Sequence, residues 1–181
     1  MDWFDDTWIG HLVHFSEPQP SAWILQKKLS EHAVFPKKGY AEEYRVPAEI
    51  KAVFVCSKLG GPGPLEAVLK IWMQLSSTSV PLTKRDIFMG GDIADWERGL
   101  ECDSGIGEQI ALERLTQGQC TSTPHFIASK AAVQDGSMRF PGGFMYYLLM
   151  TKLPGIQVES FKSLSNRERS ELRGAFQRAW L

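Results

Sequence analysis

The chain has 181 residues, of which 43% are hydrophobic and 23% charged, and its net charge at pH 7 is −1. Ten Phe and six Trp can furnish a core for one domain or a domain with a tail, which argues against wholesale disorder. Nucleic-acid binding needs clustered Lys and Arg, so the near-neutral charge argues against it. No run of about 18 apolar residues is present, and we expect no membrane span.

The N-terminus is acidic and lacks the basic start and apolar stretch of a secretory signal. Cys56, Cys102 and Cys120 are odd in number and have no CxxC spacing, so they predict neither a disulfide framework nor a zinc site. We expect all three to be buried or inert thiols in a reducing compartment. The sequence therefore indicates a cytoplasmic protein.

Residues 1–32 are expected to form an N-terminal extension. Within it, Ser21–Leu29 is predicted as a short amphipathic helix, because Trp23, Ile24 and the lysine pair fall on different helical faces. A first hairpin is then expected near residues 34–55.

Two β-branched and aromatic runs, Ile50–Ser57 and Ala67–Met73, predict the next pair of strands. Residues 58–64 between them are dense in Gly and Pro, which favours a tight antiparallel connection. Residues 76–107 are polar and irregular, and we interpret them as a long connection with a helical turn near residues 93–98. A helix is predicted over residues 107–116, where apolar residues recur at helical spacing.

A brief apolar segment, Pro124–Ala128, precedes the continuous apolar run Phe144–Met150, which glycine and proline pairs punctuate on both sides. That punctuation favours a buried strand. A final helix is predicted from Ser165, because Glu168 three residues later completes a capping box.

The predicted order is strand, strand, helix, strand, strand, helix. We therefore expect an α+β fold in which a twisted antiparallel sheet of about five strands carries one packed helix, with further helices at both termini. The sheet domain is expected over residues 33–155, and a helical segment over residues 156–181.

Lys70 lies in the middle of a strand that is otherwise built for burial. Such a lysine either extends its ammonium into solvent from an edge strand, or is held so that the ammonium meets nucleotide phosphates. A phosphate-binding lysine needs a carboxylate from the next helix, and Glu108 opens that helix here. Glu108 is alternatively an ordinary acid in a first helical turn. Glu113 is the rival partner, and we favour Glu108 because two leucines follow it at the expected offsets.

Four segments occur in an order that is known from one family. They are Ala-Val-Leu-Lys-Ile at residues 67–71, Glu-x-x-Ala-Leu-x-x-Leu from Glu108, residues 120–128, and residues 141–155, which end in Leu-Met-x-Lys-Leu-Pro-Gly. This ordered set resembles fungal protein-kinase-like proteins, of the aminoglycoside phosphotransferase-like branch of the kinase superfamily. The resemblance covers roughly residues 50–180, and its specificity lies in the ordered set.

The resemblance implies the N-terminal lobe and hinge of a kinase. Lys70 would contact nucleotide phosphates, and Glu108 would be its helix partner. Thr151 stands where the family is expected to have an acidic residue. Because hinge contacts to the nucleotide use backbone groups, we expect this difference to have little effect. The implied hinge, whose backbone groups would pair with adenine, consists of Leu149, Met150, Thr151, Lys152 and Leu153.

The glycines at residues 60–63 do not predict a phosphate loop. Gly63 lies only seven residues before Lys70, and Pro62 and Pro64 lack the N–H groups that would cradle phosphate. We expect this segment to be the turn that joins the second and third strands of the lobe. The hairpin before it has Gly39 as its only glycine, so a glycine-rich loop over the phosphates is absent.

Phosphoryl transfer needs a positioning Asp and a metal-holding Asp or Asn from the lobe after the hinge. The 26 residues after Gly155 contain no Asp and no His, and their single Asn is Asn166. The leading expectation is therefore a truncated kinase-like lobe that is inactive alone and binds ATP weakly, with Mg²⁺ not expected without the second lobe. Two alternatives stay open: an ATP-dependent phosphotransferase completed by a missing C-terminal lobe, and a non-catalytic protein-interaction module.

A lone lobe would also leave apolar residues uncovered on its lower face. Self-association or a protein partner is expected through that face, in addition to a nucleotide, with neither nucleic acid nor membrane as a partner. The side chains that would lose their cover are Leu149, Leu153, Phe161, Leu164, Phe176 and Trp180.

Overall fold

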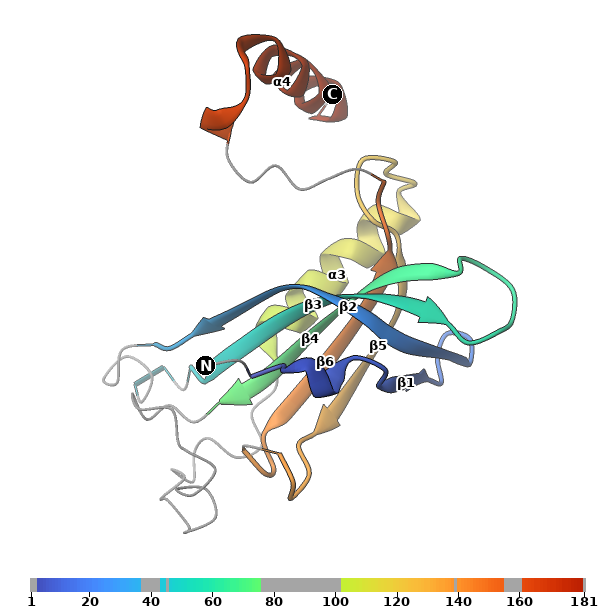
Figure 1. Ribbon diagram of the computed structural model, residues 1–181, viewed down its shortest axis with the longest axis vertical. Helices are drawn as coiled ribbons and strands as arrows, with labels where there is room; N and C mark the ends of the chain where they lie inside the picture. Colours follow the sequence, from blue (N-terminus) through green and yellow to red (C-terminus); the bar gives the residue numbers. More distant parts are fainter. Residues whose placement is uncertain are drawn as a thin grey trace.

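The computed structural model describes residues 3–36, 43–44, 46–75, 102–138, 140–154 and 161–180. Figure 1 shows a strongly curved sheet, one helix lying across it and a second helix beyond its end. Six antiparallel strands follow the order β1-β2-β3-β4-β6-β5, and β1 approaches β5, so that the sheet is nearly closed like a barrel. The strands are β1 (Leu12–Phe15), β2 (Ser21–Val34), β3 (Ala48–Lys58), β4 (Glu66–Leu75), β5 (Phe126–Val133) and β6 (Phe144–Thr151).

The α-helices that the structure describes over their whole length are α3 (Asp103–Gln117) and α4 (Asn166–Trp180). Short 3-10 helices, η1 (Asp6–Trp8) and η3 (Phe161–Ser163), precede β1 and α4. Helix α3 packs against β5 and β6. The expected α+β class, with an antiparallel sheet and one packed helix, is confirmed. Neither described helix combines the length and apolarity that a membrane crossing requires.

The two faces of the sheet carry different cores, because successive residues of a strand point to opposite sides. One face fills the barrel interior with fully buried side chains such as Leu25, Phe54 and Leu69. The other face packs against α3 through a smaller cluster, which consists of Trp72, Cys102, Leu112, Phe144, Tyr146, Leu148 and Met150.

The helix predicted over residues 21–29 is wrong, because these residues form the first part of β2. Trp23 pairs with Val13 of β1 and with Lys58 of β3, and alternate residues Trp23 and Leu25 are buried. The expected N-terminal helix is only the single turn η1. Residues 1–32 thus contribute β1 and most of β2 to the common sheet.

The N-terminal segment also fills part of the barrel interior. Phe4 is fully buried against Trp8 and Phe54. The Lys28 ammonium donates to the Phe4 carbonyl at 2.7 Å and forms an ion pair with Glu31 at 2.9 Å. This half-buried pair ties the segment to β2.

The turn expected between the second and third strands of the lobe is confirmed as the connection of β3 and β4. Gly60, Gly61 and Gly63 adopt positive φ angles there, a conformation that residues with a side chain rarely take. The hairpin expected near residues 34–55 is only partly correct. Its second strand is β3, but β3 pairs with β2, which lies before the expected range and ends at Val34. Gly39 lies outside the described residues. The helical turn expected at residues 93–98 also lies outside them.

The two later predicted helices begin near their expected positions. Helix α3 starts four residues earlier than predicted, at Asp103. The capping box of α4 is confirmed, because the Ser165 amide donates to Glu168 Oε2 at 2.8 Å and the Glu168 amide donates to Ser165 Oγ at 3.3 Å. The donors of Ser165 hold the pKa of the Glu168 carboxyl below its usual value.

Two buried amides lock the turn between β5 and β6 against β4. Gln134 Nε2 donates to the Gln74 carbonyl at 2.8 Å, and Gln134 Oε1 accepts from the Phe140 amide at 3.3 Å. Gln74 Oε1 in turn accepts from the Phe144 amide at 3.0 Å. Both glutamines are almost fully buried, so water does not replace these bonds.

We predict that Gln134→Leu lowers the free energy of unfolding by about 2 kcal/mol, because it removes the side-chain hydrogen bonds to the buried Gln74 carbonyl and from the Phe140 amide. Gln26→Leu is the control, since Gln26 is exposed and bonds only to Ser57 Oγ, at 2.7 Å. The control is expected within about 0.5 kcal/mol of wild type. Urea unfolding followed by Trp fluorescence measures both, and equal midpoints for the two variants would contradict the lock.

Candidate functional site

Lys70 lies on a central strand of the sheet. On β4 it is opposite Val53 of β3 on one side and Leu148 of β6 on the other. Val68 and Trp72 flank it on the face that looks toward α3, because residues two apart share a face. The reading of Lys70 as an edge-strand lysine is therefore wrong.

Glu108 of α3 forms an ion pair with Lys70, through Oε1 and Nζ. The side chains are 23% and 32% exposed, so both are partly shielded from solvent. The predicted approach of these two residues is confirmed. Glu113 lies five residues on, about 140° around the helix, and accepts instead from Gln109 Nε2 at 2.7 Å.

The N-terminal end of α3 is fixed to β3. The Ser104 hydroxyl lies 2.8 Å from each carboxylate oxygen of Glu49 on β3. Cys102 caps the helix, because its Sγ accepts from the Gly105 amide at 3.3 Å. These contacts set the start of the helix that presents Glu108.

The C-terminal end of α3 is fixed to β5. Thr116 Oγ1 donates to the Leu112 carbonyl at 2.7 Å and accepts from the Phe126 amide at 2.8 Å. With both ends held by neighbouring strands, the position of Glu108 over β4 is determined by the sheet.

Gly105 allows α3 to approach the sheet closely. A Cβ at this position would lie 2.6 Å from Tyr146 Cδ1 and 2.8 Å from Cys102 Sγ, closer than side chains permit. The Tyr146 hydroxyl donates to Gln109 Oε1, one turn further along α3. Burial raises the pKa of Tyr146, which keeps this donor protonated at neutral pH. This contact has no predictive pattern in the sequence beyond a glycine at the start of an amphipathic helix.

An apolar surface adjoins the ion pair on the same sheet face. Val55 of β3 is opposite Val68 of β4, which is opposite Met150 of β6. Met150 is buried, whereas Val53, Val55 and Val68 are only half-buried. The half-buried valines beside the Lys70 ammonium can contact a ligand that joins an apolar ring to an anionic group.

The first hinge residues belong to the end of β6. Leu149 is fully buried in the barrel interior, so its predicted exposure is wrong, while Met150 faces the α3 side. The Thr151 amide donates to the His125 carbonyl at 2.9 Å, and Thr151 Oγ1 accepts from the His125 amide at 2.8 Å. The Thr151 amide therefore has a partner within the protein.

The last hinge residues leave the sheet. Lys152 and Leu153 follow the final ladder pair, between Ala67 and Thr151. The Lys152 ammonium lies 2.7 Å from Glu66 Oε2 in an exposed ion pair. Leu153 is 45% exposed, as predicted. Within the implied hinge, Lys152 and Leu153 are therefore the residues whose backbone groups lie beyond the β4–β6 ladder.

The cysteines differ in burial. Burial raises the pKa of Cys56 and Cys102 to about 12, so both stay protonated thiols. Cys120 is only half-buried, and the neighbouring polar groups of Thr123 and Ser122 lower its pKa. The expected burial is confirmed for Cys56 and Cys102, whereas the inertness of Cys120 stays a prediction.

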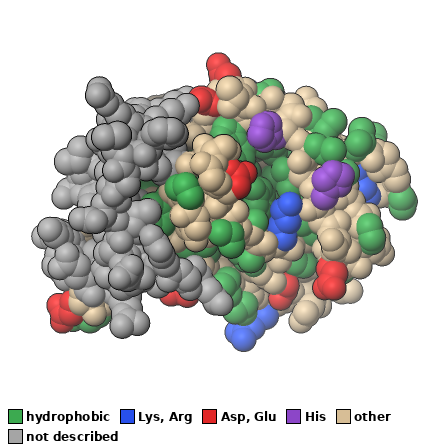
Figure 2. Space-filling model, turned by 90° about the horizontal axis from the view of Figure 1, so that it is seen from below, with side chains coloured by type: hydrophobic (Ala, Val, Ile, Leu, Met, Phe, Trp, Pro, Cys, Tyr) green, Lys and Arg blue, Asp and Glu red, His purple; other side chains and the backbone are tan. Residues whose placement is uncertain are grey.

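Outside the Lys70–Glu108 pair, the described residues offer few clusters of charged or metal-ligating side chains. Within the described residues, no group of three or more His, Cys, Asp or Glu side chains is arranged to hold a metal ion. On the face in Figure 2, basic side chains are scattered among apolar and acidic ones. The Lys70–Glu108 pair and its apolar surroundings are the candidate site.

Comparison of the chain with protein-family models, with curated proteins and with solved structures found no match. The kinase-like interpretation therefore rests on the ordered motifs and on the geometry of this site.

We predict that Gly105→Ala lowers the free energy of unfolding by about 1–3 kcal/mol, because the added methyl group forces α3 away from Tyr146. Gly107→Ala is the matched control in the same helix, where a Cβ would meet nothing within 4 Å. It is expected to stabilise the protein by up to about 1 kcal/mol, since Ala favours helix. Chemical unfolding measures both, and a stabilising Gly105→Ala would contradict the close approach.

Proposed function

We propose that this chain is a kinase-like lobe that binds the phosphates of ATP through Lys70 and does not transfer a phosphoryl group by itself. The observation that carries the proposal is the ion pair of Lys70 with Glu108, which joins a central strand to the following helix. Kinases hold their phosphate-binding lysine by the same kind of pair.

The pair suits a ligand-binding lysine because it positions the ammonium without saturating it. An ammonium has three donors, and one Glu108 oxygen occupies one of them. The side chain retains 23% exposure, so phosphate oxygens can reach the remaining donors. In a fully buried ion pair, the lysine would have to separate from its carboxylate before it could bind a ligand.

The neighbouring surface supports a nucleotide as the ligand. Val55 and Val68 offer an apolar contact for the base beside Lys70. The backbone groups of Lys152 and Leu153, past the end of the ladder, are the hydrogen-bonding groups that the base would use. Since the sheet supplies one wall of a cleft, we expect weak binding.

Phosphoryl transfer needs further carboxylates or amides that position the acceptor and hold metal ions. Among the acids after the hinge, Glu168 bonds to Ser165 and Glu171 pairs with Arg167 at 2.8 Å. Residues beyond this chain, or a second chain, would have to complete an active phosphotransferase. The proposal is therefore nucleotide binding without turnover.

Titration calorimetry with ATP tests the proposal. We predict that Lys70→Met lowers the affinity at least about tenfold, because a charge-assisted hydrogen bond to phosphate is lost. Lys28→Met is the matched control: Lys28 is 26% exposed and also forms an ion pair with a glutamate, but on β2. It is expected to lose stability without losing ATP affinity.

Equal affinities of wild type and Lys70→Met, or no binding by wild type, would contradict the proposal. Labelled ATP with Mg²⁺ and a panel of acceptors tests the second half of it. Turnover that disappears in Lys70→Met would show instead that this chain completes an active site.

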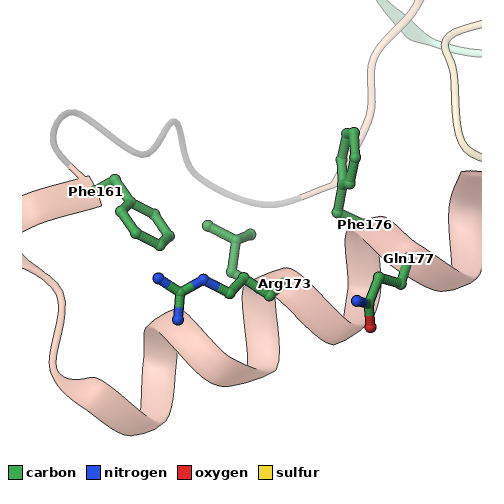
Figure 3. A pocket seen from close by; sticks show the side chains of 5 residues that line it. Phe161, Arg173, Phe176 and Gln177 are labelled. Atoms are coloured by element: carbon green, nitrogen blue, oxygen red, sulfur yellow. The ribbon is translucent and has the colours of Figure 1, made fainter.

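A second candidate function, protein interaction, is favoured by the surface of α4. Phe176 is 66% exposed and Leu172 39% exposed, and with Phe161 they line a groove of about 580 Å³ (Figure 3). The Arg173 guanidinium lies 5.2 Å from the centre of the Phe161 ring. An isolated helix of 15 residues is only marginally stable in water. We therefore expect these exposed apolar side chains to pack against another surface.

We predict that the protein self-associates through this groove and that Phe176→Ser shifts it toward monomer. Val133→Ser is the control, because Val133 is 68% exposed on β5. Sedimentation equilibrium at several concentrations measures both variants. A monomer at every concentration, or an equal shift in the two variants, would contradict self-association through α4.

A further inference from the structure

We infer that Lys51 is a second phosphate-binding residue of the candidate site, and that the site therefore selects nucleoside di- and triphosphates over monophosphates and nucleosides. This inference rests on the proposed function and specifies its ligand. It comes from the positions of two lysines on one face of the sheet.

Lys51 and Lys70 are diagonal neighbours on β3 and β4. Val53 is directly opposite Lys70, and Lys51, two residues before it, is opposite Trp72. Residues two apart share a face, so both lysines lie on the side that carries α3. Diagonal neighbours in an antiparallel pair are about 7–8 Å apart, within reach of one extended phosphate chain for two long side chains.

The Lys51 ammonium has no carboxylate partner among the described residues. No ion pair in the described part of the chain includes Lys51, and its ammonium lies 5.9 Å from the centre of the Trp72 ring. The carboxylate of Glu49, two residues before Lys51 on β3, is bonded instead by the Ser104 hydroxyl. Glu108 is paired with Lys70, so neither carboxylate forms an ion pair with Lys51.

The backbone here cannot bind phosphate in place of a side chain. β3 pairs with β2 on one edge and with β4 on the other, and Lys51 itself is opposite His32 and Trp72. Its ladder amides are therefore used within the sheet. Because the glycines at residues 60–63 do not predict a phosphate loop, we expect side chains to meet the charge of a triphosphate, and Lys51 is the cation adjacent to Lys70.

Binding of ATP, ADP, AMP and adenosine to the full chain tests the inference. Wild type is expected to bind ATP and ADP more tightly than AMP and adenosine. Lys51→Met is expected to lower ATP affinity about tenfold while leaving adenosine affinity unchanged, because only the phosphate contact is lost. Lys51→Arg is expected to retain most of the affinity. Lys162→Met, which removes the same charge from η3, is the control and is expected to match wild type.

The outcomes separate this inference from the proposed function. If wild type binds no ATP, the proposed function fails and this inference fails with it. If wild type and Lys70→Met behave as proposed but Lys51→Met binds ATP like wild type, only the role of Lys51 is overturned. If Lys51→Met weakens ATP and adenosine equally and lowers the melting temperature, Lys51 supports Trp72 structurally and the inference is also overturned.

Discussion

The ion pair between Lys70 and Glu108 is the interaction on which the site depends. It places a cation in the centre of a sheet and holds it with a carboxylate from α3, which crosses that face. The pair forms only if α3 lies close to β4 and β6, which requires the absence of a side chain at Gly105. A single backbone position thus controls the geometry of the Lys70–Glu108 pair.

The rest of the sheet supplies the rigidity that this pair needs. The closed interior is packed with buried aromatic and aliphatic residues, and Gln74 and Gln134 hold the β5–β6 turn against β4. The opposite face is only partly covered by α3, which leaves Val53, Val55 and Val68 half-buried beside the lysine. The main core and the candidate site therefore lie on opposite faces of one sheet.

Short sequence patterns predicted the elements whose structure depends mainly on residues that are neighbours in the chain. The turn between β3 and β4, the apolar strand β6 and the capping box of Ser165 each have a short signature, and each was found. β2 was missed because irregularities between Leu25 and Lys27 and between Lys28 and Ser30 interrupt its alternation, and the resulting spacing imitates a helix. The contacts of Ser104 with Glu49 and of Tyr146 with Gln109 join distant segments and have no local signature.

In the proposed site, Glu108 holds the Lys70 ammonium ready for a phosphate group. NMR of selectively labelled lysine side chains, with the Lys70 signal assigned by Lys70→Arg, observes that group directly during titration with ADP. We predict a saturable shift of the Lys70 signal, with no comparable shift for Lys28, and weaker saturation in Glu108→Gln. A Lys70 signal that does not respond to ADP, or a response that is independent of Glu108, would contradict it.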